Sequence, residues 1–384
     1  MTSTLITGGS IATEEGLLRG GDLLIEGRKI RRIARRIPAK GARVVPARGR
    51  LVAPGLIDLQ VNGAFGVSFV SANSGEVSSA SRRLLEFGVT AYLPTLVSRP
   101  HEELRAAIGR VREAAADDGG ARILGIHLEG PYLNAEKAGA HRKEFLRPPS
   151  LTELRDLLSA AGGTIRMVTL APELPGALDL VREGDEGGVV MAAGHSGATA
   201  DQIRAAAEAG LRHVTHVFNA MSGFHHRDET ILNAALATDA LSCSAIYDRY
   251  HLSPGTFRVL LRAKPPGKLA LVSDAIAALG APDGPVEVEG MKLVVEGGAV
   301  RDAESGRLTG GAKSILDGVR NAAEDFGLAA DRALFLGSGA PAGILGIGRR
   351  KGVLRAGADA DVILLDRKWT VRSVFVEGVL RLER

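Results

Sequence analysis

The stretch GLIDLQVNG, residues 55–63, is the first of eight apolar runs that decide the fold. It is rich in aliphatic residues and ends on a polar pair, Gln60 and Asn62. Short apolar runs bounded by turn residues are typical of buried strands. The seven runs that follow are VTAYLPTLVS, RILGIHLEGP, TIRMVTLAPE, GVVMAAGHSG, RHVTHVFNAM, LSCSAIYD and KLALVSDAIAA.

Stretches with a helical period separate these runs, among them PHEELRAAIGRVREAAA, LTELRDLLSAA, TADQIRAAAEAG and PGTFRVLLRA. Ser150 and Ser253 precede two of the stretches as predicted caps, the second with Pro254 at the helix start. Eight β-then-α units across roughly 280 residues predict an α/β protein built on a (β/α)8 barrel of the TIM type. A doubly wound sheet is the alternative, but no G-x-G-x-x-G follows the first run.

The two ends of the chain have a different sequence pattern, in which apolar residues alternate and glycines are frequent. They predict a small β-sandwich built from both termini, residues 1–52 plus 344–384. The barrel then occupies residues 53–343. A chain of 384 residues is long enough for one large domain with a small partner.

Composition and charge exclude several classes of function. The net charge is only +4, and the densest basic run, RKIRRIARRIPAK (residues 28–40), has no interleaved aromatics, so we expect a solvated sheet edge and not a nucleic-acid site. The single cysteine, Cys243, cannot form an internal disulfide and is read as a buried small hydrophobe. No signal peptide and no apolar stretch near 18 residues is visible, so we expect a cytoplasmic protein with no membrane partner.

In a barrel of this type the site lies at the carboxyl ends of the strands. The period of two puts His127 and Glu129 on one face of the third run. His195 ends the fifth run and His216 the sixth. One carboxylate and two histidines on different strand ends form a plausible three-ligand site with an open position, as expected of catalytic zinc or a similar ion.

Purely structural roles also stay open for these residues. Glu129 could cap a loop, and a lone histidine such as His195 is more often structural than a ligand. His213 lies three residues before His216 and is read as structural. Asp274, at the end of the eighth run, could carry a proton or could be a helix N-cap, and the sequence favours neither.

Several motifs together resemble the N-acetylglucosamine-6-phosphate deacetylases of the amidohydrolase superfamily. They are APGLIDLQVNGAFGVSF, HLEGPYLNAEKAGAH, GHSGAT, THVFNAM, DRYHLSP, SDAIAALG and LTGGAKSI, in the order of that family and over most of the chain. The resemblance implies that Glu129, His195 and His216 bind metal, that Asp274 is the catalytic acid/base, and that His141 contacts the acetyl carbonyl. It further implies substrate contacts at Ala140, His141, Asn219, Ala220, Arg227, Asp248, His251, Leu308, Thr309 and Gly310.

The first run departs from the metal-rich form of this superfamily. Many members read D-x-H-x-H-G here, whereas this chain has Gln60 and Asn62 at the histidine positions. Amides are poor metal ligands beside imidazole. We therefore expect one divalent metal ion per subunit, with zinc favoured and Fe2+, Co2+ or Mn2+ as alternatives. Gln60, Asn62 and His127 are then expected beside the ligands or toward the substrate.

The resemblance also implies a homodimer acting on a sugar phosphate, with a basic residue such as Arg227 or His251 reaching the phosphate across the interface. Arg227 could instead pair with Asp228 or Glu229 beside it. Another amidohydrolase, such as a dihydroorotase-like enzyme with a carboxylated lysine, is a rival, but Glu129 stands where that lysine would be needed. A catalytically dead scaffold is a second rival, against which the intact set of candidate residues argues.

Overall fold

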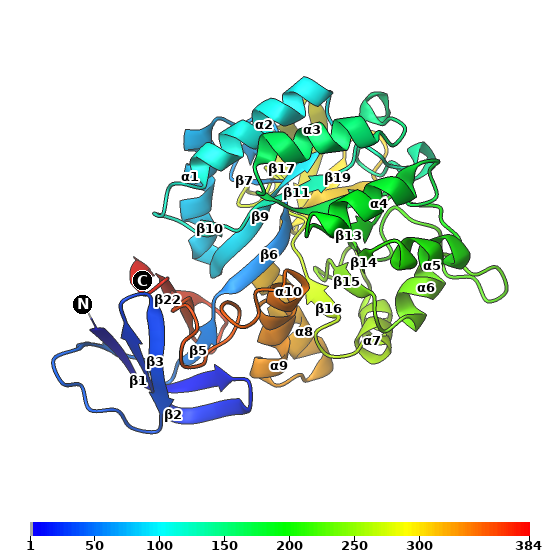
Figure 1. The fold of residues 1–384 in the computed structure, drawn as a ribbon. Helices are drawn as coiled ribbons and strands as arrows, with labels where there is room; N and C mark the ends of the chain where they lie inside the picture. Colours follow the sequence, from blue (N-terminus) through cyan, green and yellow to red (C-terminus); the bar gives the residue numbers. More distant parts are fainter. Residues whose placement is uncertain (1–2) are drawn as a thin grey trace.

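The computed structural model describes residues 3–384, and Met1 and Thr2 of the predicted small unit lie outside the described residues. Figure 1 shows a barrel surrounded by helices, with a separate sheet beside one end of it where both chain termini lie. Among residues 3–384, no helix has both the length and the apolar character needed to cross a bilayer.

Eight parallel strands form the barrel, which confirms the predicted fold. They pair in sequence order, and a short strand, β10 (Arg122–Ile123), pairs with β9 just ahead of β11. All eight predicted runs therefore supply strands. These are β6 (Leu56–Val61), β9 (Val89–Val97), β11 (Ile126–Glu129), β12 (Ile165–Leu170), β13 (Val190–Ala193), β14 (Leu211–Val214), β15 (Ser242–Ala245) and β16 (Leu269–Leu271).

The barrel is nearly closed, and its seam lies between β16 and β6. Only one backbone bridge, from Val61 to Ala275, joins them as a ladder would. The buried carboxylate of Asp58 helps to bind the seam, because it accepts hydrogen bonds from the backbone N–H groups of Gln60 and Ser273, each at 3.2 Å. Backbone donors that lack a ladder partner at the seam are thus satisfied by a side chain. Burial raises the pKa of Asp58 to about 7.

Helices cover the outside of the barrel, as Figure 1 shows for α2, α3 and α4. Ser150 and Ser253 cap two of them as predicted, and Pro254 opens α7. Ala340 of α10 packs in one buried cluster with Ile57, near the start of β6, so α10 closes the amino-terminal end of the barrel. The helices are α1 (Ser74–Leu84), α2 (His101–Ala114), α3 (Leu151–Ala161), α4 (Ala177–Glu186), α5 (Ala200–Glu208), α6 (Ile231–Ala237), α7 (Pro254–Ala263), α8 (Ile315–Phe326), α9 (Ala330–Leu336) and α10 (Gly339–Ile344), with 3-10 turns η1 (Leu85–Phe87), η2 (Ala135–Lys137) and η3 (Lys143–Phe145).

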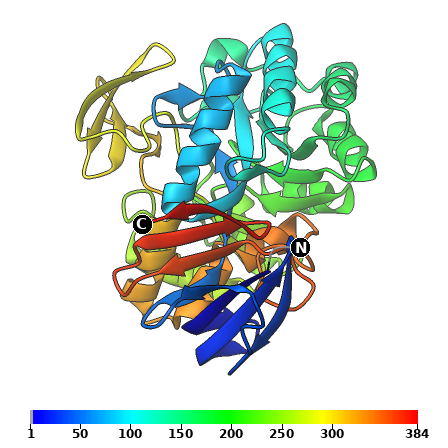
Figure 2. The same cartoon turned by 90° about the vertical axis from the view of Figure 1, so that its left-hand side faces the viewer.

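Strands from both chain ends build the small β unit, and Figure 2 shows them side by side below the barrel. Hydrogen bonds join them in one path, β23-β22-β21-β5-β1-β2-β3, with β4 beside β1. The basic run forms edge strand β3, in which Ile30 is buried while Arg31 and Arg32 are exposed. The predicted division at residues 52/53 and 343/344 stays a prediction. The strands are β1 (Ser3–Thr13), β2 (Gly16–Glu26), β3 (Lys29–Ala34), β4 (Arg43–Pro46), β5 (Leu51–Pro54), β21 (Val362–Leu365), β22 (Val371–Val376) and β23 (Val379–Glu383).

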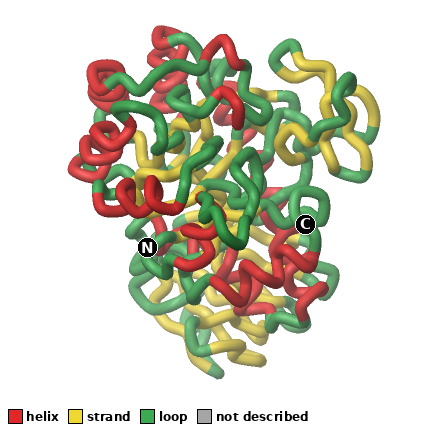
Figure 3. Tube along the Cα trace, turned by 90° about the vertical axis from the view of Figure 1, so that its right-hand side faces the viewer, coloured by secondary structure: helices red, strands yellow, loops and turns green. Residues whose placement is uncertain are grey.

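An antiparallel sheet that we did not foresee is inserted after the eighth barrel strand. Its four strands follow one another as a meander, and Figures 2 and 3 show it projecting from one side of the barrel. Its strands are β17 (Gly284–Val288), β18 (Met291–Glu296), β19 (Ala299–Asp302) and β20 (Leu308–Gly311). A further two-stranded hairpin, β7 (Gly63–Ala64) and β8 (Val67–Ser68), follows the first barrel strand.

Candidate active site

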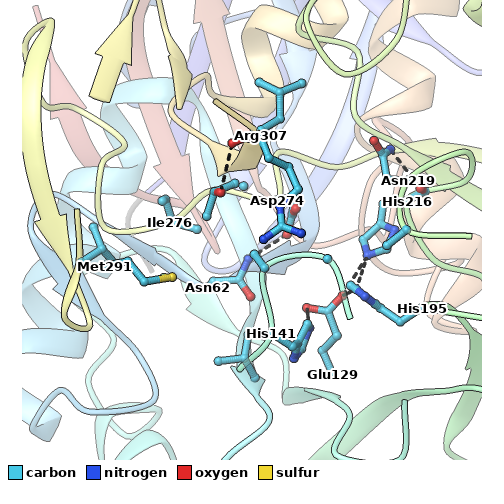
Figure 4. Close-up of a pocket in the computed structure, with 18 of the residues that line it drawn as sticks. Asn62, Glu129, His141, His195, His216, Asn219, Asp274, Ile276, Met291 and Arg307 are labelled. Carbon is cyan, nitrogen blue, oxygen red and sulfur yellow. Dashed lines mark hydrogen bonds and ion pairs between the residues drawn. The ribbon is translucent and has the colours of Figure 1, made fainter. Parts of the chain in front are cut away.

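A cavity of about 520 Å³ lies at the carboxyl ends of the barrel strands. The strand ends supply its floor, and the inserted sheet supplies part of its wall. Figure 4 shows Glu129, His195 and His216 pointing toward one another inside it, with Asn62 and Asp274 beside them. The size suits a small-molecule site.

Glu129, His195 and His216 meet at a single point. Glu129 Oε1 lies 3.2 Å from His195 Nε2 and 2.9 Å from His216 Nε2, and the two ring nitrogens are 3.1 Å apart. His195 and His216 follow β13 and β14 with positive φ angles of 49° and 30°. Such angles are uncommon for residues other than glycine and cluster at functional sites. The structure thus brings together the three predicted ligands.

The hydrogen-bonding pattern of the three groups fits a cation. His195 Nδ1 lies 2.9 Å from the backbone oxygen of Lys137, which can only accept, so Nδ1 carries a proton. Nε2, which lies 3.2 Å from Glu129 Oε1, is therefore the nitrogen of His195 that is available to a cation. Two imidazoles and a carboxylate that converge in this way form a donor set for zinc or a similar divalent ion. His141 belongs to the same potential metal-binding group as Glu129 and His195.

His141 faces the other oxygen of the Glu129 carboxylate, Oε2, whereas His195 and His216 face Oε1. Its Nε2 is 3.5 Å from Glu129 Oε2, and its Nδ1 is 3.0 Å from Ser98 Oγ. The ring packs edge-on against His195, with centroids 4.5 Å apart. Burial, and then the neighbouring His195, lower the pKa of His141.

The two amides of the first run each contact a carboxylate. Gln60 Nε2 donates to Glu129 Oε1 at 2.9 Å, and Asn62 Nδ2 donates to Asp274 Oδ1 at 2.7 Å. Asp274 has a positive φ of 48° at the end of the eighth run. Burial, and then the charge of Glu129, raise the pKa of Asp274 to about 6, within the range useful for proton transfer near neutral pH.

His127 and His213 are buried and form their hydrogen bonds with residues outside this group. His127 is buried, with Nδ1 3.1 Å from the Leu59 backbone oxygen and Nε2 2.8 Å from Thr169 Oγ1. Burial lowers the pKa of His127 to about 4, so the ring is neutral. His213 is also fully buried and contacts Ser242 Oγ at 2.8 Å, consistent with the structural role we predicted for it.

Most of the predicted substrate contacts line the cavity, and two do not. The first exception is Asp248, which lies behind His251 and holds its Nδ1 at 2.7 Å. The second is Arg227, which is exposed and contacts His226 at 2.8 Å. The role of each predicted contact stays a prediction. Those that line the cavity are Ala140, His141, Asn219, Ala220, His251, Leu308, Thr309 and Gly310.

Sequence reasoning found Leu308, Thr309 and Gly310 of β20, but it missed the part of the cavity wall that comes from the rest of the inserted sheet. Glu289, at the β17–β18 turn, accepts a hydrogen bond from the buried Arg99 at 2.8 Å, and this ion pair ties the sheet to the end of β9. Arg301 and Arg307 add positive charge to the same wall. The alternating stretch PVEVEGMKLVVEGG was the signal available for these strands.

Comparison with known proteins agrees with this geometry. The model of the Amidohydrolase family matches residues 51–381. The chain is 38% identical over 336 residues to N-acetylglucosamine-6-phosphate deacetylase of Danio rerio, covering 85% of this chain and 83% of that protein. It is 34% identical over 328 residues to N-acetylgalactosamine-6-phosphate deacetylase of Escherichia coli, covering 85% and 86%. A mutant N-acetyl-D-glucosamine-6-phosphate deacetylase from Mycobacterium smegmatis, solved in complex with N-acetyl-D-glucosamine-6-phosphate, superposes with a TM-score of 0.92 at 32% identity, covering all of both chains.

Proposed function

We propose that this chain, which belongs to the amidohydrolase family, hydrolyses the acetamide of N-acetyl-D-glucosamine 6-phosphate to give acetate and D-glucosamine 6-phosphate. The observation that carries the proposal is the convergence of Glu129, His195 and His216 beside Asp274 at the mouth of the barrel. This arrangement suits metal-assisted hydrolysis of an amide.

Glu129, His195 and His216 hold one divalent ion, for which zinc is favoured and Fe2+, Co2+ and Mn2+ are alternatives. When bound, such an ion supplies a Lewis acid that polarises the acetamide carbonyl and makes water a better nucleophile. The protein supplies the remaining chemistry through side chains that move a proton, donate a hydrogen bond or orient the substrate.

Asp274 is the proton carrier in this reaction. Asn62 occupies its Oδ1, which leaves Oδ2 free to take a proton from the attacking water and return it to the departing amine nitrogen. A pKa near 6 lets the same carboxylate accept and release that proton. His141 donates a hydrogen bond from Nε2 to the acetyl oxygen as negative charge develops there.

The phosphate end of the substrate lies toward Asn219, Ala220 and His251, with Asp248 orienting the His251 ring. Arg227 is exposed in this single chain. We propose that it reaches the phosphate of a neighbouring subunit in a homodimer, where its planar guanidinium suits phosphate oxygens. We further propose that the enzyme works in the cytoplasm.

Replacing Asp274 with asparagine tests the mechanism. We expect acetate release to fall by about 10²- to 10⁴-fold, because a neutral amide cannot accept the proton. Asp118→Asn, at an exposed carboxylate, is the matched control. Metal content is measured in both variants. A turnover near that of the wild type with metal still bound contradicts the role of Asp274, and a purified wild type without bound metal contradicts the whole proposal.

N-acetylgalactosamine 6-phosphate is the second candidate substrate, because the Escherichia coli relative is named as a deacetylase of that compound. The two sugars differ only in the orientation of one hydroxyl, so a direct comparison of kcat/KM decides between them. The same assay with the unphosphorylated sugars measures what the phosphate contributes. A preference for the unphosphorylated sugar contradicts the proposed phosphate contacts.

A further inference from the structure

We propose that Ser98 is a positioning residue that holds the His141 imidazole with its proton on Nε2. The inference rests on the proposed function, in which His141 donates a hydrogen bond to the acetyl oxygen. Ser98 is the first residue after β9 and is 1% exposed. Ser98 lines the cavity beside His141, and its hydroxyl contact to His141 Nδ1 lets it act through the histidine.

The argument begins with the two nitrogens of His141. A neutral imidazole carries one proton, which lies on Nδ1 or on Nε2. Nε2 faces the site, 3.5 Å from Glu129 Oε2, and Nδ1 faces Ser98 Oγ at 3.0 Å. To donate to a carbonyl oxygen in the site, Nε2 must carry the proton. Nδ1 must then accept a hydrogen bond, and the hydroxyl that it contacts within residues 3–384 is that of Ser98.

The surroundings of Ser98 leave its hydroxyl free for this task. Its other acceptor within reach is the backbone oxygen of Glu129, at 3.4 Å, which is at the long end for a hydroxyl donor. Because that contact is so long, the hydroxyl proton is better placed toward His141 Nδ1. With a donor on Nδ1, the ring is fixed both in its tautomer and in its rotation.

The neighbouring glycine makes room for the hydroxyl. A Cβ at Gly130 would come within 2.2 Å of Ser98 Oγ, so any larger residue there would displace the hydroxyl. Gly130 also has a φ of +85°, which favours glycine for backbone reasons alone. The turn after Glu129 is thus compatible with a hydroxyl at position 98 only because position 130 has no side chain.

A second buried serine–histidine pair in the same barrel provides a matched comparison. Ser242 Oγ lies 2.8 Å from His213 Nδ1 and 3.0 Å from the backbone oxygen of Arg212; this oxygen can only accept and lies within ordinary hydroxyl range, so Ser242 donates to it. Ser242 must therefore accept from His213 Nδ1, which is the opposite tautomer. Neither Ser242 nor His213 lines the cavity. The two pairs have the same chemistry but a different proton placement.

Kinetics of Ser98 variants provide the first test. We expect Ser98→Ala to lower kcat by about 10- to 100-fold, the range found for groups that orient metal-binding histidines, with KM changed less than about 3-fold. Ser98→Thr keeps the hydroxyl and Ser98→Val has the same shape without it, so the threonine variant should recover activity relative to the valine variant. Ser242→Ala removes the matched hydroxyl and should leave kcat unchanged. Equal activity of the threonine and valine variants overturns the proposal.

Nitrogen NMR of zinc-loaded, ¹⁵N-histidine-labelled enzyme provides a readout that does not depend on turnover. The His141 signals are assigned by their loss in His141→Asn. We expect a proton on Nε2 in the wild type and a shifted or mixed tautomer in Ser98→Ala, with metal content unchanged. A proton on Nδ1 in the wild type overturns the proposal. Failure of the proposed substrate leaves this spectrum unaffected, so the two ideas fail separately.

Discussion

Replacing Lys351 with methionine is expected to lower the free energy of unfolding by about 3 to 5 kcal/mol, the usual cost of removing one partner from a buried ion pair. Lys351 follows α10 and is only 2% exposed. Its ammonium lies 2.7 Å from Asp361, 3.1 Å from Asp359 and 3.3 Å from Glu377. Methionine keeps the apolar stem, so the change removes the charge with little loss of volume.

Asp361 decides the magnitude. Asp359 keeps a second cation, Lys29, at 2.6 Å, and Glu377 keeps Arg28. Among residues 3–384, Asp361 has no other cation within 4.0 Å, and its side chain is 4% exposed. Without Lys351 its carboxylate is therefore a buried, unpaired charge. Asp361→Asn in the Lys351→Met background removes that charge and should recover much of the lost stability.

Thermal unfolding between pH 5 and pH 8 measures the effect. With about 2.1 cal/mol/K of unfolding entropy per residue, one cooperative transition of the 384-residue chain should lose roughly 4 to 6 °C in Tm. Burial raises the pKa of Asp361 and Lys351 opposes this, so the variant raises it further. An acid with a raised folded-state pKa stabilises the fold below its unfolded pKa, and this contribution is lost as the pH rises through the folded value.

The deficit of Lys351→Met should therefore be larger at pH 8 than at pH 5. Lys368→Met, at an exposed lysine, is the control and should leave Tm unchanged. A loss below about 1 °C that does not depend on pH would show that Lys351 contributes little and that the reasoning about Asp361 is wrong.

Three further predictions follow from the site and the seam. Removing the metal with a chelator should abolish acetate release and lower Tm, because a ligand that binds only the folded state stabilises it; activity that persists after verified metal loss contradicts this. Because the pKa of Asp58 is raised to about 7, the free energy of unfolding of the wild type falls as the pH rises through that value. Between pH 5 and pH 8 this fall should be smaller in Asp58→Asn by about 3 kcal/mol. Parallel curves of Tm against pH for the two proteins contradict this. Arg99→Met should raise KM more than it lowers kcat, because the ion pair with Glu289 fixes the inserted sheet and not the reacting groups; a fall in kcat alone contradicts it.

The sequence predicts the barrel and the ligand set because both depend on local patterns. Strand ends in a barrel meet at one face, so polar residues at the ends of separate runs, such as Glu129 and His216, come together whatever the loops do. The inserted sheet escaped prediction because residues 284–311 were placed within the barrel range 53–343 without being examined for strands of their own. Its contribution to the site depends on the pairing of Arg99 with Glu289, 190 residues apart, which no local pattern encodes.

Proton placement was also beyond the sequence. The serines at positions 98 and 242 occupy similar places beside buried histidines, yet they differ in which group donates. The difference lies in a few tenths of an ångström to a backbone oxygen, 3.4 Å in one case and 3.0 Å in the other. The buried carboxylate of Asp58 likewise accepts its hydrogen bond at the seam from the backbone of Ser273, 215 residues away.

The amides of GLIDLQVNG now have a physical role. A carboxylate oxygen only accepts, so Gln60 must turn its N–H toward Glu129 and Asn62 must turn its N–H toward Asp274. Imidazoles at these two positions would offer lone pairs to a second cation. The amides instead donate N–H hydrogen bonds to the carboxylates of Glu129 and Asp274. The substitution therefore converts two potential ligands into two orienting donors. In the proposed function, this directs Glu129 at the metal and leaves one oxygen of Asp274 for the proton.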